Sequence, residues 1–319
     1  MRSILSFALV LLIATGCATR PPGPSAPSAV ATMRHEPWDL KYPHSTCLVS
    51  PHYRIYTDID DPDTLDQLTQ LMEGAFRQYQ LLAPGIPLSK QALRSYIFAG
   101  REQWAAFTAK NTGADAPIYL KISRGAYTVD DWFVAFWLGD RGTFAVAAHE
   151  GWHQFVARNY AGRIPPAIEE GIACMFEDVE WKGRLPQWNI GAAPSRRRVL
   201  ASAMTTGNRW PLEKLLRLHA GDVIGLPRQQ IDTFYAQTWA LAMFLREAED
   251  GRYRSAFQRY LADIAAGQAY RPAELSSLGQ REWNPAVAGA QLAHYLNLPL
   301  SEIDTRYQRY CRTLTDSAD

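Results

Sequence analysis

The stretch "TFAVAAHEGWHQFVARNY", residues 143–160, decides how the rest of the chain is interpreted. Its apolar residues recur at helical spacing, which predicts one amphipathic helix. His149 and His153 are four residues apart, so both imidazoles lie on one face and can bind a single ion. Glu150 follows the first histidine and is placed to hold a water as a general base. The pattern is H-E-x-x-H, and its alternative is a helix that merely carries two histidines and an acid.

A catalytic zinc site needs a third protein ligand and an open position for water. The segment "RIPPAIEEGIACMFEDVEW", residues 163–181, predicts a second helix, because a proline pair fits the first helical turn. The turn before this helix sends the chain back towards the first one. A glutamate in its first turns, Glu169 or Glu170, can therefore reach the same ion.

These residues resemble the gluzincins, the peptidase MA-like zinc metallopeptidases that include thermolysin-like and aminopeptidase branches. The resemblance lies in H-E-x-x-H followed at a modest distance by E-G-x-A, and it covers residues 143–180. It implies a zincin-like fold and makes Glu170 the third zinc ligand beside His149 and His153. Glu169 stands where the aminopeptidases have Asn. As a whole, the chain looks most like uncharacterised gluzincin lipoproteins of bacteria.

A third segment extends the resemblance. "DTFYAQTWALAMFLREAE", residues 232–249, predicts a helix with a tyrosine near its start, as gluzincins have. The resemblance implies that the Tyr235 hydroxyl stabilises the oxyanion at the scissile carbonyl. The alternative is an aromatic core residue beside Phe234 and Trp239.

The remaining pattern predicts an α+β fold, with a mixed sheet first and a mostly helical second half. The expected strands are 52–58, 93–99 and three more between 117 and 138, the expected helices are 62–82 and 101–111, and the chain is expected to be helical from Thr143 onward. Either 125–129 or 132–138 is a candidate edge strand for an extended peptide substrate.

Charge gives no sign of a nucleic-acid partner. The 319 residues hold 33 basic and 32 acidic side chains, a formal net charge of +1, which lacks the basic excess that phosphate binding requires. The densest basic run, Arg196-Arg197-Arg198, is expected on a solvated loop, and the alternative is a patch that faces the substrate.

The N-terminus "MRSILSFALVLLIATGC" reads as a secretory signal peptide, because its apolar run is too short to span a bilayer. Its end resembles a bacterial lipobox, which implies cleavage after residue 16 and a lipid on Cys17; the alternative is an ordinary cleavable signal. A Pro-, Ser- and Ala-rich tether is predicted over 17–45, and one zinc metallopeptidase-like domain over 46–315. Ala18 after the cysteine favours, by analogy, the outer membrane facing the periplasm.

Three further cysteines follow. An oxidising compartment permits a disulfide, and we expect Cys47 and Cys311, near the two ends of the domain, to form it. Cys174 lies among apolar residues and is expected in the core.

The sequence thus predicts one Zn²⁺ ion and hydrolysis of peptide bonds by a membrane-anchored lipoprotein. The aminopeptidase motif G-x-M-E-N is absent from the sequence, which favours an endopeptidase acting on a peptide or protein. Two alternatives remain at this point. One is a zinc amidase for another amide substrate, and the other is a catalytically silent zincin-fold lipoprotein that serves as a binding or scaffold module.

Overall fold

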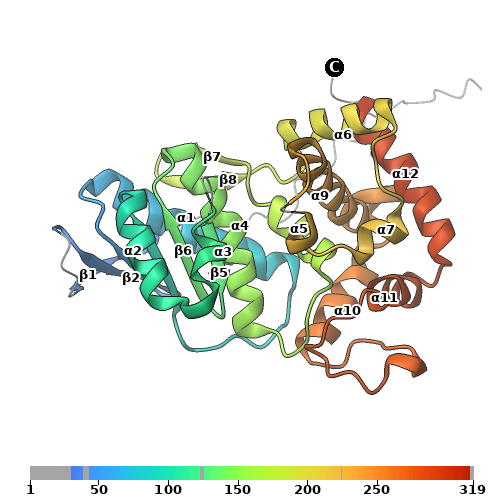
Figure 1. Cartoon of the computed structure of the whole chain (residues 1–319), viewed down its shortest axis with the longest axis horizontal. Helices are drawn as coiled ribbons and strands as arrows, with labels where there is room; N and C mark the ends of the chain where they lie inside the picture. The colour runs from blue at the N-terminus through green and yellow to red at the C-terminus, as the bar shows by residue number, and fades with distance from the viewer. Residues whose placement is uncertain (1–29, 39–42, 123–125, 224, 317–319) are drawn as a thin grey trace, which may run out of the picture.

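The computed structural model describes residues 30–38, 43–122, 126–223 and 225–316 (Figure 1). The predicted signal peptide, the lipidation site at Cys17 and most of the predicted tether lie outside these residues. Among those described, no helix is both long and apolar enough to span a bilayer.

The N-terminal half is built on a mixed six-stranded sheet in the order β1-β2-β3-β4-β6-β5. Its strands are β1 (Arg34–Pro37), β2 (Thr46–Val49), β3 (Tyr53–Thr57), β4 (Leu93–Phe98), β5 (Ala126–Val129) and β6 (Trp132–Phe136). β3, β4 and β6 run parallel, whereas the other neighbouring pairs are antiparallel. β5 is therefore the edge strand of the two candidates, and β6 is interior. β1 pairs with β2, so the sheet begins inside the segment predicted as a tether.

Helices connect the strands. α1 (Pro62–Leu82) begins at the cap Asp61, whose carboxylate accepts from the Thr64 backbone N–H at 2.9 Å, and α2 (Arg101–Asn111) follows β4. The predicted strand at 117–123 is wrong: α3 (Ala116–Tyr119) and a turn occupy its described part. Pro117 lacks the N–H that a strand ladder needs but is suited to the first turn of a helix.

The C-terminal half is helical, as predicted, with one exception. Its helices are α4 (Asp140–Asn159), α5 (Pro166–Cys174), α6 (Pro194–Thr206), α7 (Leu212–Arg217), α8 (Ala220–Val223), α9 (Arg228–Gly251), α10 (Arg254–Ala265), α11 (Val287–Leu296) and α12 (Leu300–Asp316). The exception is a hairpin of β7 (Val179–Lys182) and β8 (Leu185–Trp188). Gly183, at φ +60°, supplies the left-handed residue that its short turn requires.

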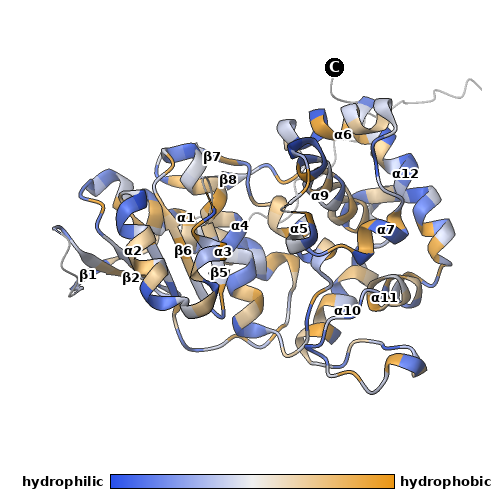
Figure 2. Cartoon of the chain, viewed as in Figure 1, coloured by the Kyte–Doolittle hydropathy of each residue, from blue (hydrophilic) through white to orange (hydrophobic). Residues whose placement is uncertain are grey.

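One hydrophobic core joins the two halves. It extends from Leu48 in β2 to Leu314 in α12 and includes the buried faces of α1, α4, α5 and α9. Figure 2 shows that the helices are amphipathic, with hydrophobic residues (orange) and hydrophilic residues (blue) on different sides. α4 and α5 lie in the middle of the molecule, between the sheet and the helices that follow α5 in the chain (Figure 1). The junction of the two halves is therefore where the predicted metal ligands lie.

The expected disulfide between Cys47 and Cys311 is wrong. Cys47 lies in β2 and Cys311 in α12, at opposite ends of the molecule (Figure 1), and each is a free, buried thiol. Burial raises the pKa of Cys311 to about 12 and also raises that of Cys47. Proximity to the two ends of a domain carries no information about distance in space, which is why the pairing failed. Cys174 is buried in the core, as expected.

Candidate metal centre

α4 presents His149 and His153 on one face because its other face is buried. Phe144, Trp152 and Phe155 are at most 4 % exposed and hold the helix against the core. The two imidazole Nε2 atoms are 3.4 Å apart. The predicted placement of both histidines on one helical face is confirmed.

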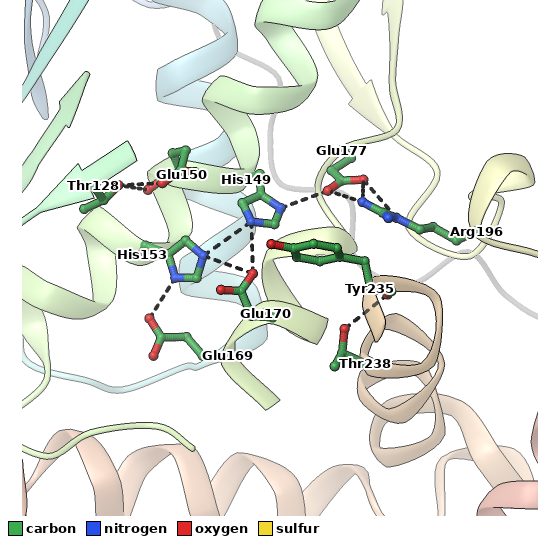
Figure 3. Close-up of polar contacts among 10 residues, drawn as sticks. All are labelled: Thr128, His149, Glu150, His153, Glu169, Glu170, Glu177, Arg196, Tyr235 and Thr238. Atoms are coloured by element: carbon green, nitrogen blue, oxygen red, sulfur yellow. Dashed lines mark hydrogen bonds and ion pairs between the residues drawn. The ribbon is translucent and has the colours of Figure 1, made fainter. Parts of the chain in front are cut away.

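α5 brings the third group to the same point. The Glu170 Oε2 atom lies 3.3 Å from the His149 Nε2 and 3.7 Å from the His153 Nε2 (Figure 3). These three residues form a group whose ligand atoms could hold one metal ion. α5 begins at Pro166, so the proline pair starts this helix as predicted.

The spacing of the three atoms suits a tetrahedral ion. Zinc–nitrogen and zinc–oxygen bonds of about 2.0–2.2 Å at tetrahedral angles separate neighbouring ligand atoms by about 3.4 Å. The three observed separations are 3.3, 3.4 and 3.7 Å. The Glu170 Oε2 atom is also buried without a hydrogen-bond donor among the described residues. A buried carboxylate oxygen in this state needs a cation beside it, either a protonated imidazole or a metal ion, and the spacing of the three atoms fits the metal ion.

Two more carboxylates fix the orientation of the histidines. The His149 Nδ1 lies 2.9 Å from the Glu177 Oε1, and the His153 Nδ1 lies 2.8 Å from the Glu169 Oε1. An ionised carboxylate can only accept, so each Nδ1 carries the hydrogen. Each Nε2 then directs its lone pair at the shared point, an arrangement that also makes the imidazoles better ligands.

A second group of possible ligands, His149, Cys174 and Glu177, lies on the other side of the His149 ring. Arg196 donates to both carboxylate oxygens of Glu177, at 2.7 and 2.6 Å. Its positive charge already neutralises that carboxylate and repels a metal ion. The group made with Glu170, where no cationic side chain intervenes, is the better metal site.

The acidic surroundings also favour protons on the imidazoles. Burial opposes protonation of His153, but the Glu170 and Glu169 carboxylates outweigh it and raise the pKa of His153 to about 10. Burial likewise opposes ionisation of Glu170, yet the two histidines hold its pKa well below the usual range. A metal ion that enters this cluster must displace protons from it.

Glycine between the two histidines has a steric reason. The Tyr79 hydroxyl of α1 donates to the Ala148 carbonyl of α4 at 2.6 Å. A Cβ on Gly151 would lie only 2.6 Å from that hydroxyl oxygen. Gly151 therefore lets α1 approach α4, the helix that carries His149 and His153, and Trp152 beside it is fully buried in the same core.

Tyr235 lies on α9 beside the candidate metal ligands. Its ring centroid is 6.4 Å from that of His149, and its hydroxyl points towards His149 and Glu170 (Figure 3). Burial and the charge of Glu170 raise the pKa of Tyr235 well above its usual value, so the hydroxyl keeps its proton. Arg196 lies 5.4 Å over the ring.

Glu150 has its own partner outside α4. The Thr128 hydroxyl of the edge strand β5 donates to the Glu150 Oε2 at 2.8 Å and lies 3.3 Å from the backbone carbonyl of the same residue (Figure 3). Glu150 is turned towards β5, whereas Glu170 lies against the two histidines.

The sequence alone did not identify Thr128, Glu177 or Arg196. Arg196 belongs to the basic run expected on a solvated loop, and that expectation is wrong: the run lies in α6, with Arg196 on Glu177 and Arg197 bonded to the Gly191 and Leu314 carbonyls. An isolated acid and arginine 19 residues apart give no periodic signal. Only the folded chain brings them together. No known family model matches this chain, and no significantly similar protein was found among curated proteins.

Proposed function

We propose that this protein is a zinc-dependent hydrolase of peptide bonds, with the gluzincin arrangement of ligands that its motifs resemble. The observation that carries the proposal is the convergence of the His149, His153 and Glu170 ligand atoms at separations that suit tetrahedral zinc. A structural zinc site has four protein ligands, whereas three leave a position for water, as catalytic sites do.

Zinc, when bound, acts as a Lewis acid and lowers the pKa of a water to about 7. Glu150, one residue after the first ligand, accepts a proton from the attacking water and passes it to the leaving amine nitrogen. Tyr235 donates its hydroxyl hydrogen to the oxygen of the scissile carbonyl as charge develops there. Glu169 and Glu177 keep the histidines in the tautomer that binds the ion.

We further propose an endopeptidase, on the absence of an aminopeptidase G-x-M-E-N motif from the sequence. The lipobox-like end of the N-terminal segment supports a lipid anchor at Cys17. The enzyme would then act from the bacterial cell envelope, on the outer membrane facing the periplasm. Its substrate would be a peptide or protein within reach of the membrane.

The test is a set of zinc and cleavage measurements on the purified protein. We expect one zinc per chain, and cleavage of a mixed peptide library that stops with a chelator and returns with zinc. Glu150→Gln should keep the zinc and lose turnover, and Tyr235→Phe should lower kcat while the zinc stays bound. A parent-like rate in Glu150→Gln would refute the assignment of the base.

Other results favour the alternatives. Bound zinc without cleavage of any peptide would favour the silent scaffold. Cleavage confined to other amides would favour the amidase. Absence of zinc would leave only a helix that carries two histidines.

A further inference from the structure

We infer that Thr128 is a positioning residue for the general base: its hydroxyl fixes one oxygen of Glu150 to the edge strand so that the other oxygen faces the attacking water. This inference rests on the proposed function. Thr128 lies outside every motif that the sequence presents, and it contacts none of the three metal ligands in the described interactions.

The first step of the argument is the place of Thr128 in the sheet. β5 is the outermost strand and pairs only with β6 among the described strands. Side chains alternate across a sheet, so Thr128 and Tyr127 point to opposite faces. Tyr127 packs into the aromatic cluster on the far face, whereas Thr128 reaches α4.

The second step is the geometry at Glu150. The 2.8 Å contact joins the Thr128 Oγ1 to the Glu150 Oε2, and no other side-chain bond to Glu150 is present among the described residues. A carboxylate held by one donor keeps its second oxygen in a defined direction. Without that donor, Glu150 can rotate about its side-chain torsions, because no other described side chain bonds its carboxylate.

The third step is the energetic scale. A hydrogen bond to a charged group contributes about 1.5–3 kcal/mol, which corresponds to a rate change of about 10- to 100-fold if it acts on the base alone. The loss should appear in kcat, since Glu150 works in the proton transfer and does not bind the peptide. Zinc binding should not change, because all three ligands stay in place.

The fourth step concerns the edge strand as the place where an extended substrate would add. A strand paired to β5 would lie beside the residue that holds the base. Through Thr128, the position of the Glu150 carboxylate depends on the position of the edge strand β5. A shift of β5 along or away from α4 would release the carboxylate.

The experiment compares Thr128→Val, nearly the same shape without the hydroxyl, with Thr128→Ser, which keeps it. Tyr127→Phe is the matched control, because it removes a hydroxyl from the same strand that bonds Thr108 at 3.0 Å on the other face. We expect Thr128→Val to lose about 10- to 100-fold in kcat. KM and zinc content should stay those of the parent, Thr128→Ser should recover most of the loss, and Tyr127→Phe should match the parent.

Crystal structures of the zinc-loaded parent and Thr128→Val provide a readout independent of turnover. We expect the Glu150 carboxylate in one position in the parent and displaced or divided between positions in the variant. An unmoved carboxylate, or a parent-like kcat in Thr128→Val, would overturn the inference. If the parent cleaves no peptide, the proposed function fails separately, and the two crystal structures still decide whether Thr128 holds Glu150.

Discussion

Gly171→Ala should damage both the stability and the activity of the protein through one added methyl group. Gly171 follows Glu170, the third candidate ligand, at the point where α5 packs against α9. A Cβ at this position would lie 2.1 Å from the Thr238 carbonyl oxygen, whereas ordinary contact begins at 3.4 Å. The atom it meets belongs to the backbone of a long, buried helix, so no side-chain rotation can relieve the clash.

The size of the effect follows from that distance. The helices must separate by about 1 Å or more, and overpacking of this kind costs about 1–3 kcal/mol in the free energy of unfolding. The melting temperature should fall by about 2–12 °C, at about 2–4 °C for each kcal/mol lost. Glu170 lies on α5 and Tyr235 on α9, so the same movement displaces one from the other. A misplacement of about 1 Å reduces turnover about 100-fold.

The assay is thermal unfolding together with zinc content and peptide cleavage. Gly191→Ala is the control, because a Cβ there would meet only the Met243 side chain, at an ordinary 3.7 Å. It should unfold and cleave like the parent. If Gly171→Ala had the parent's melting temperature and turnover, the close approach of α5 to α9 would not be what sets the distance between Glu170 and Tyr235.

Two further predictions concern carboxylates that do not bind the metal directly. Glu177→Gln should weaken zinc binding about 10- to 100-fold in chelator competition, because His149 loses the carboxylate that orients it; unchanged affinity would show that Arg196 or packing suffices. Glu73 is 2 % exposed and accepts bonds from Ser50 and His52, which hold its pKa below 4.5 against the cost of burial. Its contribution to stability is therefore complete above about pH 4.5 and is lost as the pH falls through its lower folded pKa. Melting temperatures should fall less steeply below pH 4.5 in Glu73→Gln than in the parent, and equal slopes would exclude this role.

The parts of the fold that follow local rules could be predicted from the sequence. The helices at 62–82 and 101–111 appear with the predicted bounds, because the cap Asp61 and the apolar spacing are local signals. The position of the H-E-x-x-H helix and of a glutamate one helix later also depends only on helical periodicity and one turn. His149, His153 and Glu170 meet for that reason.

What failed depends on distances between segments far apart in the chain. The Cys47–Cys311 pairing needed the separation of β2 and α12, which no local pattern encodes. Thr128 and Arg196 reach the site through strand order and helix packing, so neither shows a motif. Gly151 is a further example. The sequence gives no reason for a glycine between the two histidines, and the reason appears only in the fold, where Tyr79 of α1 contacts α4.

The three consecutive residues Glu169, Glu170 and Gly171 each contact a different part of the protein. The first orients His153, the second would supply the third ligand atom of the proposed metal site, and the third lets α9 approach. If α5 rotated about its axis by the angle of about 100° that separates neighbouring residues, all three contacts would be lost together. The three contacts therefore fix the rotation of α5. We therefore expect the three residues to be retained or lost together in evolution. Distant relatives that keep the metal are expected to keep a hydrogen-bond acceptor, a carboxylate and a glycine in that order, even where the surrounding sequence has diverged beyond recognition.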